Sequence, residues 1–310
     1  MLLLWVLFIV FALGMLVLDL RVFHRPGRAS SFRAALGLSS IYVALAAAFF
    51  AILFHWQGRQ TALEFAAGYL LELSLSVDNL FLFLVIFNYF AVPEQQQHRV
   101  LFWGVIGALM MRLVFILAGV ELLNRFHWIL YGLGALLIYS GIQLGFSGGH
   151  KVNPASNPLV KMLQRILPVT QDYRGGKFIV RDPTTAALAA TPLLVVLLVI
   201  ETSDLLFAVD SIPAVLAITL NAFVVFTSNV FAILGLRSMY FAVSGLMKLF
   251  RFLPKGLAFM LILVGIKMLA SDYYRVSTPI TLSVMGTVLL VSIAASLVFP
   301  GPDGSGGKNS

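Results

Sequence analysis

Long apolar runs, separated by short polar stretches, dominate the chain. Nine such segments occur, at 2–20, 36–54, 65–90, 100–120, 128–146, 186–220, 222–247, 256–270 and 280–299. A helix of about 20 residues crosses a hydrocarbon core of about 30 Å. A membrane-spanning barrel would instead alternate apolar and polar residues in shorter segments, and a solid run such as 2–20 does not. The pattern predicts an all-α, polytopic membrane helix bundle with about nine transmembrane helices.

Composition supports a membrane protein. Of the 310 residues, 60% are hydrophobic and 11% are charged, whereas soluble domains carry about 25% charged residues. The chain therefore has too few polar groups to face water on all sides, and lipid is its expected surroundings. It contains no cysteine, which excludes disulfides, thiolate metal sites and cysteine nucleophiles.

The net charge of +8 indicates orientation in the membrane and not nucleic-acid binding. When the loops are assigned to alternate sides, 15 Lys and Arg residues fall on one side, three on the other, and three inside apolar segments. Basic loops remain in the cytoplasm. The N-terminus is therefore expected outside and the C-terminus in the cytoplasm.

The chain contains two copies of one pattern. Segments 72–79 and 204–211 both begin with an acid and end with Asp followed by a small oxygen donor. Two later pairs keep the same order: Arg112 with Arg237, and Gly141 with Gly265. The offsets are 132, 125 and 124 residues, so the register holds with one small deletion. Shared apolar composition is the alternative explanation, but it does not account for matching charged positions.

Each copy holds three crossings, so the two copies are expected to be inverted relative to each other. Inverted-repeat transporters bind substrate at the repeat interface near the bilayer midplane. The expected division is repeat one at about 65–146, a cytoplasmic connection at about 147–185, repeat two at about 186–270, extra helices at 2–20, 36–54 and 280–299, and a disordered tail at 301–310.

Five carboxylates fall inside apolar segments. They are Glu72, Asp78, Glu201, Asp204 and Asp210. An ionised Asp at a helix centre costs roughly 2.5–3.5 kcal/mol to insert, and residues kept there are usually functional. Three intramembrane cations are the expected charge partners: Arg112, Arg237 and Lys267. The remaining charge of −2 would be balanced by one divalent cation or by two protons. Purely structural ion pairs are the alternative for any single acid.

Ligand chemistry narrows the choice of ion. The five histidines lie in loops or at segment ends, so an intramembrane site would consist of oxygen donors. Such donors suit Mg²⁺, Ca²⁺ and Mn²⁺. Asn79 and Ser211 follow an aspartate in equivalent places and add an amide and a hydroxyl oxygen. Pro213 cannot bond to the carbonyl of Val209, which predicts an unwound stretch at 210–214 with free carbonyl ligands.

Three motifs resemble the TerC family, and most closely its Alx branch. They are segments 72–79, 201–214 and 227–241, and the similarity extends over nearly the whole chain. The family takes its name from tellurium resistance, and members are associated with manganese export and homeostasis. The resemblance implies a bacterial cytoplasmic membrane protein with an ion site lined by Glu72, Asp78, Asn79, Glu201, Asp204, Asp210 and Ser211.

Export of Mn²⁺ by alternating access, with proton counter-movement, is the function that the sequence predicts. No tightly bound cofactor and no catalytic residue is expected, since the chain has no His-Glu-x-x-His motif and no recognisable nucleophile motif. Two alternatives remain open. One is a transporter of Ca²⁺ or another hard cation. The other is a non-transporting membrane protein that handles metal or acts as a scaffold.

Overall fold

The fold is known from a computed structural model that describes residues 2–23, 32–126, 128–147, 158–170, 172–181, 187–243, 252–271, 274 and 276–298. Its helices are α1 (Leu2–Phe23), α2 (Phe32–Trp56), α3 (Arg59–Tyr89), α4 (Glu94–Arg125), α5 (Ile129–Ser147), α6 (Pro158–Ile166), α7 (Pro192–Leu216), α8 (Ala222–Val243), α9 (Leu253–Leu269) and α10 (Thr278–Val298). Every predicted apolar segment overlaps one of these helices. The helical fold class is confirmed.

Within the described residues, five helices are long and apolar enough to cross a membrane: α2, α4, α5, α7 and α10. The count of nine crossings stays a prediction. Several helices begin before the apolar run that revealed them, such as α3 at Arg59 and α4 at Glu94. Hydropathy marks only the part of a helix that lies in hydrocarbon, so polar first turns escape it.

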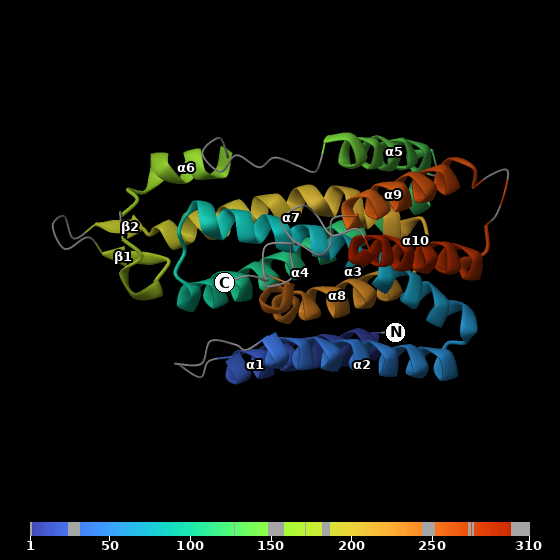
Figure 1. The fold of residues 1–310 in the computed structure, drawn as a ribbon, viewed down its shortest axis with the longest axis horizontal. Helices are drawn as coiled ribbons and strands as arrows, with labels where there is room; N and C mark the ends of the chain where they lie inside the picture. Colours follow the sequence, from blue (N-terminus) through green and yellow to red (C-terminus); the bar gives the residue numbers. More distant parts are fainter. Residues whose placement is uncertain are drawn as a thin grey trace, which may run out of the picture.

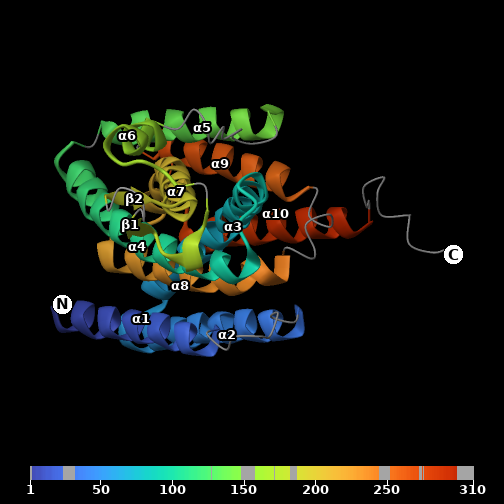
Figure 2. The same cartoon turned by 90° about the vertical axis from the view of Figure 1, so that its left-hand side faces the viewer.

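The helices run side by side in stacked layers. Figures 1 and 2 both show α1 and α2 on one side of the bundle, α5 and α9 on the opposite side, and α3, α4, α7 and α8 between them. Helices α1 and α2 pack on the inner layer through aromatic rings. Phe231 of α8 lies 5.8 Å from Phe8 and 5.1 Å from Phe49, between ring centroids. Two of the three helices outside the predicted repeats, α1 and α2, therefore cover one face of the bundle, whereas the third, α10, packs on α3 and α9.

The two copies pack on each other in reciprocal pairs: α3 with α8, α4 with α7, and α5 with α9. The pair α5–α9 shows this in atomic detail. A β-carbon placed on Gly141 would lie 2.7 Å from the carbonyl oxygen of Ala258, and one on Gly265 would lie 2.7 Å from that of Gly134. At the offset of 124, Gly141 is equivalent to Gly265 and Gly134 to Ala258. A two-fold relation between inverted repeats produces contacts of this kind.

The connection between the copies contains a small sheet that the sequence did not predict. Strand β1 (Ile179–Arg181) pairs antiparallel with β2 (Leu188–Ala190). The predicted helical segment 186–220 was therefore too long at its start. Helix α7 begins at Pro192, after Thr191 at the N-cap, because proline suits the first turn of a helix, where its missing N–H is not needed.

The connection lies against one end of the bundle, with α6, β1 and β2 together there (Figure 1). The Tyr173 hydroxyl donates a hydrogen bond to the carbonyl oxygen of Phe90 at 2.5 Å. The Arg99 guanidinium donates to the carbonyl oxygen of Gly176 at 2.7 Å. Since Phe90 is the C-cap of α3 and Arg99 lies in the first turns of α4, these bonds fix the connection to repeat one.

Candidate cation site

A small cavity lies where the two copies meet. Its polar lining residues are Asn79, Ser140, Asp210 and Ser211, which we call the cavity group; its apolar lining residues are Leu75, Leu144, Phe207 and Leu261. About 20 Å³ is open to the centre of a water-sized sphere, which is room for about one water molecule or a bare ion. At the offset of 132, Leu75 is equivalent to Phe207 and Asn79 to Ser211. The cavity is therefore built from matching positions of both repeats.

Oxygen atoms dominate the polar lining of this cavity. Ser140 of α5 donates a hydrogen bond to Oδ1 of Asp210 on α7, at 2.6 Å. Asn79 Oδ1 and Ser211 Oγ are buried without a hydrogen-bond partner. Buried polar atoms are nearly always hydrogen-bonded, and one that is not requires an explanation such as an ion or a water molecule. A carboxylate, an amide oxygen and hydroxyls on three helices are donors that a hard cation accepts.

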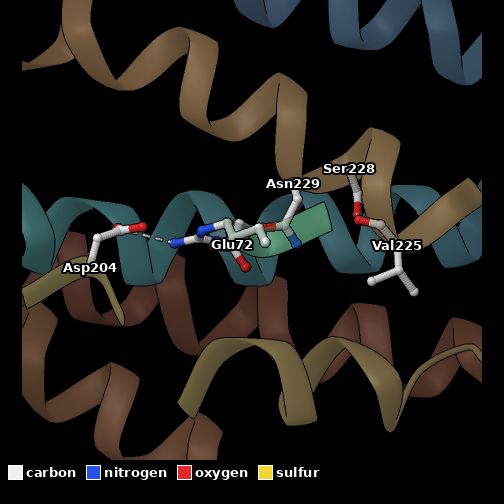
Figure 3. A network of polar contacts seen from close by, with 6 residues as sticks. Glu72, Asp204, Val225, Ser228 and Asn229 are labelled. Carbon is white, nitrogen blue, oxygen red and sulfur yellow. Dashed lines mark hydrogen bonds and ion pairs between the residues drawn. The ribbon is translucent and has the colours of Figure 1, made fainter. Parts of the chain in front are cut away.

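A second cluster, which we call the arginine group, consists of Glu72, Arg112, Asp204 and Asn229. Arg112 of α4 forms an ion pair with Glu72 of α3, and its Nη2 lies 3.5 Å from Oδ1 of Asp204 on α7. Its Nη1 donates to Oδ1 of Asn229 on α8 at 2.5 Å. Figure 3 shows Glu72, Asp204 and Asn229 converging from three helices.

The arginine group is sealed from solvent. The side chains of Arg112 and Glu72 are each 1% exposed. At the offset of 132, Glu72 and Asp204 are equivalent, so the guanidinium joins the same position of the two repeats. Charges buried this deeply must be paired and hydrogen-bonded, because the cost of removing them from water is several kcal/mol each.

Glu201 stands three residues before Asp204 on α7, close enough for the two negative charges to repel each other. Its half-buried carboxylate rests against α4 at Gly107, where a β-carbon would overlap Oε1. A side chain at position 107 would therefore displace this carboxylate. Because this carboxylate is the far end of a flexible side chain, it can move away from a larger residue at position 107.

The remaining predicted residues are only partly described. The side chains of Asp78 and Arg237 lie outside the described part of the structure. Lys267 is half-buried in the last turn of α9, where the charge acting on it is that of Glu64, so it belongs to neither group. Across the described residues, no three acidic or histidine side chains come close enough to share one metal ion.

The expected unwound stretch at 210–214 is wrong. Helix α7 continues from Pro192 to Leu216 with Pro213 inside it. The proline falls in the last turn, where it removes one backbone hydrogen bond close to the helix end and does not interrupt the helix. Backbone carbonyls of this stretch are therefore not available as cation ligands in this conformation.

Sequence reasoning missed Ser140, Asn229 and Gly107. Asn229 stands inside segment 227–241, which was singled out without a role for this amide. Ser140 precedes Gly141, and an isolated serine in an apolar helix gives little signal by itself. Their importance depends on which helix faces which, and spacing along one helix does not reveal that.

These features define a multi-pass helical membrane protein with ionisable groups enclosed in its bundle. Residues 57–301 match the integral membrane protein TerC family. The chain belongs to the TerC family.

Full-length relatives support this assignment. The chain is 45% identical over 295 residues to an uncharacterized membrane protein of Myxococcus xanthus, STKORF319, covering 95% of this chain and 92% of that protein. It is 43% identical over 300 residues to a putative membrane-bound redox modulator Alx of Salmonella typhi, covering 94% and 92%. The corresponding Alx protein of Escherichia coli K12 is 41% identical over 299 residues, covering 94% and 92%. No solved structure matches the chain.

Proposed function

We propose that this protein exports a divalent metal cation, Mn²⁺, across a bacterial cytoplasmic membrane by alternating access. The observation that carries the proposal is the cavity at the repeat interface, lined by oxygen donors from both copies. Inverted-repeat transporters hold their substrate at such an interface and expose it to each side in turn. The cavity group supplies donors for the ion. Asp78 is the equivalent of Asp210 in repeat one, and the sequence predicts it as a further ligand.

The donors support a hard cation. The chain has no cysteine, and the cavity group contains no histidine. Carboxylate, amide and hydroxyl oxygens suit Mn²⁺, Ca²⁺ and Mg²⁺, and selection among these ions depends on the number and flexibility of ligands. Titration of the purified protein with each of the three ions separates Mn²⁺ from a Ca²⁺ transporter.

Proton exchange follows from the charge balance. Carboxylates that share a site repel each other when the cation leaves, and protonation relieves the repulsion. The empty transporter would then carry protons back while the loaded one carries metal. An inward proton gradient is expected to drive Mn²⁺ out.

The name of the Alx relatives, a putative membrane-bound redox modulator, suggests a second function. The chain has no cysteine, so thiol–disulfide exchange by its own side chains is excluded. Control of the cellular level of a redox-active metal would influence redox chemistry indirectly. The redox role therefore follows from metal export and needs no separate site.

Transport by variants in proteoliposomes tests the proposal. Replacing Asp210 or Asp78 by asparagine removes a charged ligand while keeping the size of the side chain, so Mn²⁺ flux is expected to fall by about tenfold or more. Glu121→Gln is the matched control, because Glu121 is an exposed acid at the end of α4 and its loss should leave flux unchanged. Wild-type flux in both aspartate variants would remove the proposed ion site.

Ser140 provides a finer test of the cavity group. In Ser140→Ala the Oδ1 atom of Asp210 loses its hydrogen bond and the cavity loses a hydroxyl oxygen. Groups that hydrogen-bond to metal ligands typically contribute 10–100-fold to affinity, so the KM for Mn²⁺ is expected to rise by about tenfold. Ser283→Ala, at an exposed position of α10, is the control. An unchanged KM in Ser140→Ala would place the ion elsewhere.

A further inference from the structure

Arg112 lies in the arginine group, outside the cavity that the proposed function assigns to the ion. Its guanidinium stands between one acid from each repeat, an arrangement that also suits a divalent cation. Arg112 contacts Glu72 from repeat one and Asp204 from repeat two, which are equivalent at the offset of 132. Because the guanidinium is tethered to α4, it cannot leave the protein as a metal ion does.

The two carboxylates are not saturated by this arginine. Oε2 of Glu72 and Oδ2 of Asp204 are buried and have no hydrogen-bond partner. A carboxylate has two oxygens and about four acceptor sites, so each acid keeps capacity for a further cation. A purely structural buried ion pair is expected to satisfy these atoms, because unpaired polar atoms in a low-dielectric interior are costly.

Arg112 also has a neutral partner to which it can hold without the acids. Nη1 donates to Oδ1 of Asn229 at 2.5 Å, and Asn229 is itself 1% exposed. Because the Asn229 amide is neutral, its hydrogen bond to the guanidinium does not depend on the negative charge of the two acids. The side chain therefore has two contacts that a divalent cation would displace, with Glu72 and Asp204, and one that it would leave intact, with Asn229.

We propose that Arg112 is a tethered cation that holds Glu72 and Asp204 in the metal-free protein and yields them to the divalent substrate, which binds there as a second position besides the cavity group, while Asn229 retains its guanidinium. The proposal rests on the proposed function, since it requires that the protein binds a divalent cation. Arg112 is then a positioning residue: it sets the affinity of the acid pair and returns when the ion leaves. Metal release becomes easier because the arginine competes for the same oxygens.

If Arg112 competes with the divalent cation for the two acids, its variants should behave differently from those of a purely structural residue. In Arg112→Gln the acids lose their internal competitor, so Mn²⁺ is expected to bind by about tenfold or more tightly, while flux at saturating Mn²⁺ falls because release slows. In Asn229→Leu the arginine loses its neutral partner and holds the acids more persistently, so Mn²⁺ is expected to bind about tenfold more weakly. Generic damage to the fold would weaken binding in both variants.

The measurement is calorimetric titration of the detergent-purified full chain with Mn²⁺, together with thermal unfolding with and without the ion. Because a ligand stabilises the state that it binds, Mn²⁺ should raise the unfolding temperature more in Arg112→Gln than in wild type. Arg125→Gln is the matched control, since Arg125 forms an exposed pair with Glu121 four residues away. It should match wild type in both measurements.

The outcomes distinguish failure of the proposed function from failure of the tethered-cation role of Arg112. Wild-type protein that neither binds nor transports Mn²⁺ overturns the proposed function, and with it this inference. Wild-type binding with unchanged or weaker affinity in folded Arg112→Gln overturns the tethered-cation role alone. If Arg112→Gln does not fold, Asn229→Leu decides: weaker binding with a wild-type unfolding temperature in the absence of the ion supports the role, and any other result overturns it.

Discussion

Glu72→Leu is expected to lower the free energy of unfolding by about 3–5 kcal/mol. Breaking a buried ion pair leaves the other charge without compensation in a medium that cannot solvate it. Arg112 would keep Asp204 at 3.5 Å and Asn229 at 2.5 Å, but would lose its ion-pair partner on α3. Thermal unfolding of purified protein in detergent measures the effect.

The matched control for this variant is Glu121→Leu. Glu121 pairs with Arg125 at 2.5 Å, but the two side chains are 60% and 70% exposed. Exposed pairs contribute about 1 kcal/mol or less, so the unfolding temperature should barely change. Equal shifts in Glu72→Leu and Glu121→Leu would contradict the buried arginine group.

Leucine at position 141 or 265 is expected to prevent α5 and α9 from packing. Even a β-carbon at either position would lie 2.7 Å from a backbone carbonyl oxygen of the facing helix, and backbone cannot yield as a side chain does. Overpacking of a core costs about 1–3 kcal/mol, and occasionally more. A leucine here should exceed that range, and size-exclusion chromatography should show loss of monodisperse protein.

Alanine at the same positions tests the repeat. Because Gly141 and Gly265 meet equivalent carbonyls at the same distance, Gly141→Ala and Gly265→Ala should lower the unfolding temperature by similar amounts. Gly132→Ala on α5 is the control, since a β-carbon there would meet nothing within 4 Å. An unchanged unfolding temperature in Gly141→Ala together with a large decrease in Gly265→Ala would argue against the symmetric contact.

The positions of the helices along the chain were predictable because an apolar segment in the hydrocarbon core has to be helical. Backbone groups in lipid must bond within their own segment, so every apolar run had to be helical, and each run overlaps a helix. The repeat was also visible, since Glu72 with Asp204 and Gly141 with Gly265 keep nearly constant offsets. The small sheet was not, because three-residue strands in a polar connection leave no periodic signal.

The division of the predicted ligands into two groups could not be foreseen. Spacing along α3 and α7 says which residues share a face of one helix, but the direction in which that face points depends on neighbouring helices. Asp210 faces Ser140 of α5, whereas Asp204 faces Arg112 of α4. The pairing of Arg112 with acids of both repeats likewise depends on three-dimensional packing, which one sequence does not contain.

The ion pair between Glu72 and Arg112 also bears on how the chain enters the membrane. The ribosome delivers α3 before α4, and these two helices are consecutive. An acid in lipid is costly while it is alone, but a hairpin of α3 and α4 brings the compensating guanidinium one helix later. When α7 is synthesised, Asp204 meets an arginine that is already inserted. The order of translation therefore means that neither acid of the arginine group remains in lipid for long without its cationic partner.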